Sequence, residues 1–364
     1  MRAIWLCMLA ACYRSGGECA VSGTCVGDEA GVDVSDAPCF GADSGVYRRI
    51  CPGKDFKDAT LDATKVDTSV DCDFIVPPRP GVVGELPLCG LVFGTVHIAD
   101  VTAAGDRPLL VFARTLLSVE GLLDVASRAA TPGVVPAGAT IPCPDAMGAS
   151  SISGGGGGAG GSFGTAGGPG GAGNDASGGT PSGLVVPLFV RAGCAGSAGG
   201  SGSQAGGAGG KPGGAVYLMS PTMIDVVSSG TINASGAGAP GGAGGGGGGG
   251  GGSGGMIVFD APSLQIQGRV FALGGGGGSG ATQTGGPGGE ALGPGNYASG
   301  GIDGTGFGGA GGRGAAAGPN GDGENGFAAG GGTSGGGGGG GGVGVIKISS
   351  PLLSGGNIDP MPTP

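Results

Sequence analysis

The stretch MIVFDAPSLQIQGRVFA at Met256–Ala272 matches the stretch LLVFARTLLSVEGLLDV at Leu109–Val125 in pattern, position by position and without a gap. Both alternate aliphatic residues with other side chains, and both place a glycine at the same point, Gly121 and Gly268. A third copy occupies residues 215–234, with two extra residues before its glycine, and residues 345–352 read as a truncated fourth copy. The pattern predicts a repeat of about 18 residues that contains three short β-strands.

Aligning the copies at their turns predicts which side chains face inward, because successive residues of a strand point to opposite faces. The first two inward columns are Leu110, Val216, Ile257 and Ile346, and Phe112, Leu218, Phe259 and Ile348. The column between them contains Val111, Tyr217, Val258 and Lys347, and the lysine marks it as outward. The later inward columns are Leu117 with Leu264, Val119 with Ile266, Leu123 with Val270, and Val125 with Ala272.

One such unit is too small to bury its apolar face alone, whereas stacked units bury a continuous column of side chains. We therefore expect an all-β fold over residues 59–364, a parallel β-solenoid of stacked repeats. A β-sandwich with a polyglycine bundle is the alternative.

Residues 131–364 hold 86 of the 100 glycines, in tracts at about 128–212, 236–254 and 274–342. These tracts are expected as insertions that leave the repeats at one corner. Because ordering polyglycine costs much backbone entropy, flexible tethers are one possibility. Low charge and Gly-Gly-Pro triplets at 167–172 and 285–290 favour the other, packed polyproline-II helices. In composition the tracts resemble the polyglycine bundles of snow-flea antifreeze proteins and phage tip adhesins.

The N-terminus has the proportions of a signal peptide, with Arg2 followed by a short apolar run in residues 1–11. Leu9-Ala10-Ala11-Cys12 resembles the lipobox of bacterial lipoproteins. The resemblance implies that Cys12 is lipidated and holds the protein to a membrane, and Tyr13 after it implies the outer membrane, facing the periplasm or the cell surface. An ordinary secretory signal is the alternative.

Residues 12–58 form a cysteine-rich head or linker, which precedes the β-repeat domain of residues 59–364. An even number of cysteines after a secretory signal predicts disulfides. Pairing each with its nearest neighbour is the simplest of the many possible arrangements. A zinc site is disfavoured because no Cys-x-x-Cys motif exists and His97 is the single histidine. The eight disulfide candidates are Cys19, Cys25, Cys39, Cys51, Cys72, Cys89, Cys143 and Cys194.

The layout as a whole resembles the glycine-rich cell-surface lipoproteins of myxobacterial type. It combines a lipobox, a short cysteine-rich head, β-repeats and polyglycine insertions. The resemblance implies a surface location but brings no activity and no catalytic residues.

No arrangement of residues points to catalysis or to a cofactor. His97 lies in a β-type run between Val96 and Ile98, where we expect it to face outward. Asp322 and Glu324 belong to an oxygen-rich loop and are the one weak candidate for a calcium site. The net charge of −10 and the absence of a basic patch exclude nucleic acid as an expected partner.

Two functions remain as hypotheses. The first is a non-enzymatic, structural or adhesive envelope lipoprotein, whose partners are the membrane and a surface polysaccharide or another surface protein. The second is a carbohydrate-binding protein or a degenerate lyase-type β-helix. Glycan sites usually need stacking aromatic side chains, and the only tryptophan, Trp5, lies in the signal segment, which favours the first.

Overall fold

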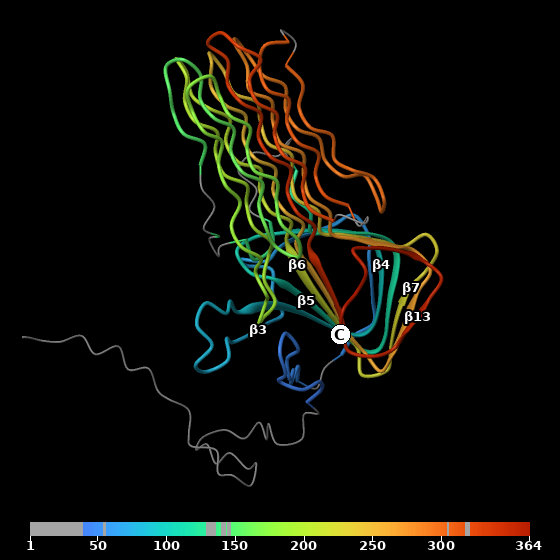
Figure 1. Ribbon diagram of the computed structural model, residues 1–364. Helices are drawn as coiled ribbons and strands as arrows, with labels where there is room; N and C mark the ends of the chain where they lie inside the picture. The colour runs from blue at the N-terminus through green and yellow to red at the C-terminus, as the bar shows by residue number, and fades with distance from the viewer. Residues whose placement is uncertain are drawn as a thin grey trace, which may run out of the picture.

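The computed structural model describes residues 39–53, 56–128, 136–139, 143, 147–303, 306–316 and 321–364, without the side chains of 352–354. These residues contain β-strands and no α-helix, and the strands join into one mostly parallel, curled sheet (Figure 1). The predicted all-β class is confirmed. The strands are β1 (Ala59–Leu61), β2 (Thr64–Asp67), β3 (Phe74–Val76), β4 (Leu88–Ala104), β5 (Leu109–Asp124), β6 (Ala215–Met219), β7 (Met223–Val226), β8 (Thr231–Asn233), β9 (Met256–Asp260), β10 (Ser263–Ile266), β11 (Arg269–Phe271), β12 (Val345–Ile348), β13 (Leu352–Ser354) and β14 (Asn357–Asp359).

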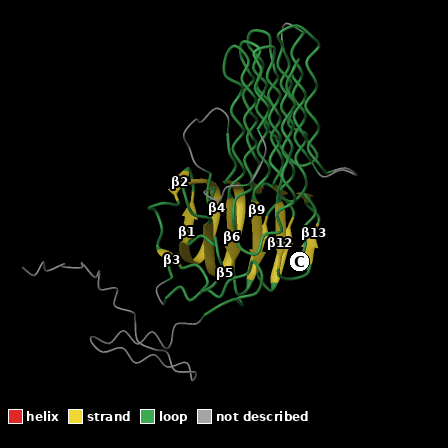
Figure 2. Cartoon of the chain, turned by 60° about the vertical axis from the view of Figure 1, so that its left-hand side comes forward, coloured by secondary structure: helices red, strands yellow, loops and turns green. Residues whose placement is uncertain are grey.

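The repeats lie on one another in chain order. The long strand β5 pairs along its length with β6, β7 and β8, which pair in turn with β9, β10 and β11. The last layer is β12, β13 and β14 on β9, β10 and β11. All these pairs are parallel, so each repeat contributes one layer, and Figure 2 shows the layers side by side.

Two features of the repeat differ from the sequence-based prediction. The fourth copy is complete, because β13 and β14 supply its second and third strands. An additional copy precedes the first, because β4 pairs in parallel with β5 from Cys89 to Thr102. Neither copy keeps the full apolar pattern. The sequence pattern therefore did not predict the last two strands of the fourth copy or the copy formed by β4.

The predicted register of the first strand is wrong by one residue. Leu109, not Leu110, lies beside Val216, and Val111, not Phe112, lies beside Leu218. The copy at 109–125 has one residue more at its first corner than the copy at 256–272, so an alignment of the two without a gap shifts the strand before that corner. The later columns are confirmed, since Leu117 reaches Leu264 through Ile224 and Leu123 reaches Val270 through Ile232.

The interior of the curled sheet is a continuous column of apolar side chains, with Leu109, Val111, Val216 and Phe259 among its members. Phe259 is 1 % exposed. The outward face of the first strands is buried too, in a second core that contains Leu110, Tyr217 and Val258. Val46 and Ile50 of the N-terminal head cover this second core. Tyr217 and Val258, which were predicted to face outward, are therefore buried in this second core. Lys347, at the end of their column, faces solvent.

The shared glycine of the repeat is explained by the spacing of the layers. A Cβ on Gly121 would lie 1.8 Å from the carbonyl oxygen of Ala99 in the layer before it. A Cβ on Gly230 would lie 2.2 Å from the oxygen of Val119, and one on Gly268 2.2 Å from the oxygen of Gly230. The second corner brings backbone against backbone, so it accepts no side chain.

The glycine-rich insertions leave the sheet between β5 and β6, between β8 and β9, and between β11 and β12. They run side by side and project from one edge of the sheet as a bundle (Figures 1 and 2). We call the described residues of 147–213, 236–254 and 274–344 the glycine bundle, and the rest of the described chain from residue 59 the sheet domain.

Three of the predicted disulfide pairs are present: Cys39–Cys51, Cys72–Cys89 and Cys143–Cys194. The first lies within the head, the second ties the turn after β2 to β4, and the third ties residue 143 to the base of the glycine bundle. Cys12, Cys19 and Cys25 lie outside the described residues.

Candidate functional site

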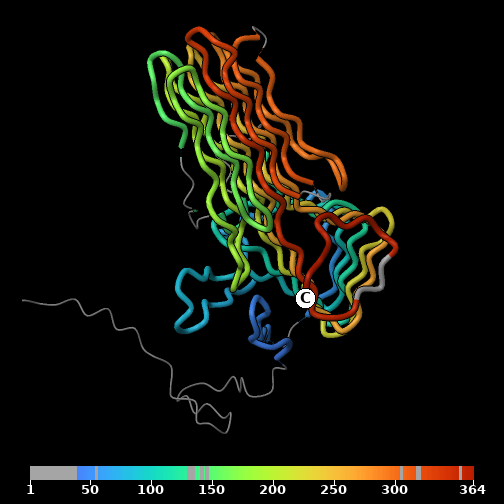
Figure 3. Tube along the Cα trace, viewed as in Figure 1, coloured from blue at the N-terminus to red at the C-terminus, as the bar shows by residue number. Residues whose placement is uncertain are grey.

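The glycine bundle is held together by backbone hydrogen bonds that repeat every three residues. N–H groups of segment 155–161 donate to carbonyls of segment 245–251 at 2.8–2.9 Å, and the pairs are Gly155 with Gly245, Gly158 with Gly248, and Gly161 with Gly251. The carbonyls of Gly155, Gly158 and Gly161 accept the N–H groups of Gly336, Gly339 and Gly342, in that order, at 2.9 Å. Each interior segment thus touches several neighbours at once, and the tube view in Figure 3 shows the segments aligned.

Close approach of the segments restricts where the bundle can carry side chains. A Cβ on Gly250 would lie 1.9 Å from the carbonyl oxygen of Ala159, and a Cβ on Gly311 1.9 Å from that of Gly277. Such distances leave no room for any residue but glycine at these inward positions. Larger side chains are therefore confined to the other positions, most of them on the outside, although a few such as Ala159 and Phe163 are buried.

The paired segments on the two sides of the bundle display different side chains, although Met147, Ile152, Leu184, Val186 and Leu188, outside those segments, are exposed as well. In segments 155–180 and 193–210 the exposed residues are Ala, Ser, Thr, Asn, Asp and Gln. Residues 285–303, 306–316 and 321–330, which we call the outer layer, expose large apolar residues instead. Their exposed fractions are Leu292 79 %, Tyr297 54 %, Ile302 79 %, Phe307 60 % and Phe327 62 %. In Figure 1 the outer layer is orange and lies on the side of the bundle away from the green segments 147–210.

The two exposed phenylalanines come from neighbouring segments. The N–H of Phe327 donates to the carbonyl of Ala310 at 2.9 Å, and the N–H of Gly330 donates to the carbonyl of Phe307 at 2.8 Å. Arg313 and Glu324 continue the same two segments and form an ion pair at 3.9 Å. The two exposed rings and this ion pair are thus carried by neighbouring segments whose backbones are hydrogen-bonded to each other. The absence of tryptophan outside the signal segment did not reveal these phenylalanines, because their exposure is not visible in the sequence.

A separate polar cluster lies on the outer face of the sheet domain. His97 of β4, Ser118 of β5 and Asp225 of β7 occupy adjacent positions in three successive layers. The Nδ1 of His97 lies 2.6 Å from Oε1 of Glu120, and the Ser118 hydroxyl donates to the same oxygen at 3.1 Å. His97 faces outward as expected, and it also lines a shallow cavity of about 260 Å³ with Asp58 and Thr60. Sequence alignment missed the cluster because β4 had not been identified as a repeat.

The two carboxylates of the polar cluster differ in pKa. The hydrogen bond from His97 lowers the pKa of Glu120 below its usual range. Partial burial, with the nearby charge of Glu120, raises the pKa of Asp225. One oxygen of Asp225 is buried without a hydrogen-bond partner. Carboxylates with separated pKa values are a feature of acid–base sites. However, Ser118 donates to Glu120 and not to His97, so these residues do not form a nucleophile–base relay.

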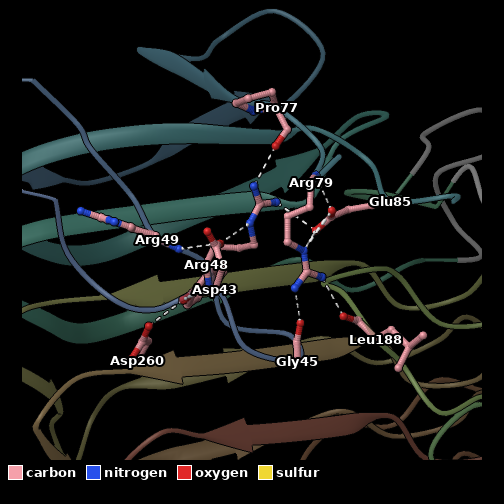
Figure 4. A network of polar contacts seen from close by, with 10 residues as sticks. Asp43, Gly45, Arg48, Arg49, Pro77, Arg79, Glu85, Leu188 and Asp260 are labelled. Carbon is pink, nitrogen blue, oxygen red and sulfur yellow. Dashed lines mark hydrogen bonds and ion pairs between the residues drawn. The ribbon is translucent and has the colours of Figure 1, made fainter. Parts of the chain in front are cut away.

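A third polar group, shown in Figure 4, holds the head on the sheet domain. Arg48 forms a buried ion pair with Glu85 at 2.9 Å, and it also donates to the carbonyl of Pro77. The backbone N–H of Arg48 donates to the hydroxyl of Tyr217, which donates to Asp260 at 2.7 Å. Burial and the charge of Asp260 raise the pKa of Tyr217. Every member has a protein partner, so this network is structural.

The carboxylates of the calcium candidates Asp322 and Glu324 accept hydrogen bonds from backbone N–H groups of the glycine bundle. Asp322 accepts the N–H of Ala166 at 3.0 Å, whereas Glu324 accepts the N–H of Arg313 at 3.3 Å. Within the described residues, His, Cys, Asp and Glu side chains form no group of three that could hold a metal ion. None of these residues forms a helix with the length and apolar character needed to cross a bilayer.

Comparison with known protein families, with curated proteins and with solved structures finds no match for this chain.

Proposed function

We propose that this protein is a non-enzymatic cell-envelope protein in which the sheet domain is a platform and the glycine bundle is a rigid, adhesive projection. The observation that carries the proposal is the outer layer of the bundle. Its outward positions are free of packing constraints, yet they hold Leu292, Tyr297, Ile302, Phe307 and Phe327, all more than half exposed. Exposed apolar patches mark interaction surfaces in soluble proteins.

The finer fold is part of this proposal. Parallel layers in chain order, each with three strands and a glycine corner, support a β-solenoid. Hydrogen bonds with a period of three residues support polyproline-II geometry in the glycine bundle, since that helix has three residues per turn. A bundle of this kind is stiff, so it holds the outer layer in a fixed position relative to the sheet domain, which residues of 285–303 contact through Glu290 with Arg128 and Gly295 with Asp359.

The envelope location has support of its own. Three disulfides are typical of proteins outside the cytoplasm, where thiols are oxidised. The membrane anchor at Cys12 is a proposal from its sequence context. Cys12→Ser should release the protein from the membrane fraction, and equal membrane recovery of the variant would refute the anchor.

Adhesion is tested by matched substitutions on the two sides of the bundle. Cells displaying the double variant Phe307→Ser, Phe327→Ser should lose attachment to partner cells and to polysaccharide-coated surfaces by about tenfold or more. Ile152→Ser is the control, because Ile152 is 86 % exposed and lies outside the outer layer. Both variants keep the buried glycine contacts, so both should fold. Equal attachment by wild type and the double variant would refute an adhesive outer layer.

Carbohydrate binding at the polar cluster is the second candidate function. The observation that favours it is the alignment of His97, Ser118 and Asp225 across three layers, next to an open cavity. Glu120→Gln should then weaken binding of an oligosaccharide several-fold in calorimetry, with no change in cell attachment. Unchanged calorimetric binding in Glu120→Gln, or no binding by the wild type, would exclude this site.

A further inference from the structure

A small cavity lies where the N-terminal head meets the last layers of the sheet domain. Its volume is about 230 Å³, and the head lines one side while the ends of β9 and β12 line the other. The cavity is smaller than the sites that hold drug-sized ligands, so it suits a molecule of a few heavy atoms or the end of one side chain. Its lining residues are Ala42, Ser44, Tyr47, Asp260, Ile348, Ser349 and Pro364.

Asp260 gives this cavity a negative charge that no cation of the described chain neutralises. It is the last residue of β9, and its Oδ2 accepts the hydroxyl of Tyr217 at 2.7 Å. Among the described residues, none donates a hydrogen bond to Oδ1 and none forms an ion pair with this carboxylate. Asp260 lies at the margin of the network in Figure 4, where Arg48 forms its ion pairs with Asp43 and Glu85 instead.

The groups around Asp260 leave its charge in place. Lys347 lies on the neighbouring strand β12, but its Nζ donates to the carbonyl oxygen of Pro364 at 2.6 Å. Burial, together with the charge of Asp260, raises the pKa of Tyr47 to about 12. The same two causes raise the pKa of Tyr217. Both phenols therefore stay neutral at physiological pH, and the net charge at the cavity is that of the carboxylate.

The hydroxyl of Tyr47 is a second polar group of the cavity that the described chain leaves without a partner. Its oxygen is buried, yet it makes no hydrogen bond to any described residue. A turn fixes the position of this side chain, because the N–H of Tyr47 donates to the carbonyl of Ser44 at 3.0 Å. A buried hydroxyl without a partner lowers stability, so a ligand that donates to it gains a hydrogen bond that the protein alone does not make.

A glycine lets the head approach the carboxylate closely. Gly41 has a φ of +75°, a conformation that other residues rarely adopt. A Cβ at this position would lie 2.7 Å from Cε of Met219 and 3.2 Å from Oδ2 of Asp260. The backbone of the head therefore lies directly beside the carboxylate, and the cavity is built between two parts of the chain that are far apart in sequence.

We propose that this cavity binds a protonated primary amine, with Asp260 as its counter-ion and Tyr47 as a hydrogen-bond acceptor and aromatic surface. An ammonium group has three N–H donors and no acceptor, which matches two oxygens that lack donors. Cations also bind favourably to the face of a tyrosine ring. The amine belongs to a small free molecule or to a lysine side chain of a partner, since both present the same group. The cavity lies apart from the outer layer of the glycine bundle, so its occupation is independent of adhesion.

Calorimetric titration of the purified full-length protein with ethanolamine tests the site. The wild type should bind ethanolamine and should not bind N-acetylethanolamine, which has the same frame without the charge. Asp260→Asn should weaken ethanolamine binding by at least about tenfold, because it removes the counter-ion while it keeps an oxygen for the hydroxyl of Tyr217. Asp225→Asn is the matched control, since it removes a carboxylate from the outer face of the sheet domain, and it should bind as the wild type does.

Tyr47→Phe tests the second group and keeps the fold, because the hydroxyl it removes has no hydrogen-bond partner among the described residues. It should weaken ethanolamine binding several-fold. Nα-acetyl-lysine methylamide separates the two sources of the amine: tighter binding than ethanolamine assigns the site to a lysine side chain, and weaker binding assigns it to a small free amine. No binding of either amine by the wild type, or equal binding by the wild type and Asp260→Asn, would overturn the proposal.

Discussion

The sheet domain and the glycine bundle are both close-packed, but they are packed with different parts of the chain. In the sheet domain side chains fill the interior, and Val216, Leu218 and Phe259 are at most 1 % exposed. In the bundle the backbone fills the interior, and glycines such as Gly250 touch the carbonyl oxygens of neighbouring segments. The first region gains stability from apolar burial and the second from hydrogen bonds and close backbone contact.

The difference has consequences for what each region tolerates. A sheet interior accepts exchange among apolar residues of similar volume. A glycine whose Cβ position lies against a neighbouring backbone, such as Gly250, accepts no larger residue, whereas the exposed positions of the bundle are less constrained. Selection for a binding surface therefore has the most freedom on the bundle, which is where exposed phenylalanine and tyrosine are found.

The largest effect is expected from a charge in the sheet interior. Phe259→Asp should lower the free energy of unfolding by at least about 4 kcal/mol, because it leaves a cavity and a buried, unpaired carboxylate. Lys347→Asp is the control on the neighbouring column; it loses a hydrogen bond to the carbonyl of Pro364 and should change stability by less than about 0.5 kcal/mol. Chemical denaturation followed by circular dichroism measures both. Similar losses in the two variants would mean that the assigned columns are wrong.

A Cβ in the bundle interior should have the next largest effect and should act locally. Gly250→Val places a Cβ about 1.9 Å from the oxygen of Ala159, so the adjacent segments must separate. Limited proteolysis should then cut the bundle at least about tenfold faster than in wild type, while the sheet signal persists, because local opening is governed by local stability. Gly183→Val is the control, since nothing lies within 4 Å of its Cβ position. Equal protease resistance in both variants would contradict a packed bundle.

A smaller effect is expected where the head meets the sheet domain. Tyr217→Phe removes the hydroxyl that accepts the Arg48 N–H at 3.0 Å and donates to Asp260 at 2.7 Å. Leaving buried polar groups without a partner should cost about 1–3 kcal/mol in unfolding free energy. Tyr297→Phe on the bundle surface, where the ring is 54 % exposed, should cost less than about 0.5 kcal/mol. A loss in Tyr297→Phe as large as that in Tyr217→Phe would argue against the assignment of Tyr217 to the buried core.

The smallest effect concerns the outer face of the sheet domain and depends on pH. Because the folded-state pKa of Asp225 is raised, its ionisation opposes folding. Its contribution to the free energy of unfolding therefore falls as pH rises through that pKa. Asp225→Asn should therefore stabilise the protein slightly at neutral pH, and the gain should vanish below about pH 4, where the aspartate is protonated in both states. Thermal unfolding at several pH values measures it. A gain that persists at low pH would point to a cause other than ionisation.

The contribution of Glu120, in the same cluster, depends on pH in the opposite direction. Its pKa is lowered by His97, so its contribution is present above the pKa of the unfolded chain and is lost as pH falls through the folded-state pKa. Because the pair is exposed, with Glu120 at 43 % and His97 at 40 % side-chain exposure, the contribution should stay below about 0.5 kcal/mol. The two carboxylates therefore partly cancel in the pH dependence of the wild type.

The repeat, the all-β class, the later columns and the pairing of the three described disulfides could be predicted from the amino-acid sequence. These features depend on local pattern, such as the aliphatic alternation of Leu264 and Ile266 and the glycine at 268, or on pairing between cysteines that follow one another in the order of cysteines along the chain. The register of Leu109, the membership of β4 in the repeat and the completeness of the last layer follow from the three-dimensional packing. One extra residue at a corner moves a side chain to the other face, and a terminal layer need not be apolar on both sides.

The candidate sites depend even more on the tertiary structure. His97 and Asp225 are far apart in sequence and share a column only because layers stack in register. Phe307 and Phe327 lie on neighbouring segments only because those segments are hydrogen-bonded within the bundle. Polyglycine has no side-chain pattern from which its neighbours could be predicted. Its order arises from backbone contacts between segments, and those exist only once the sheet domain has brought the ends of the insertions together.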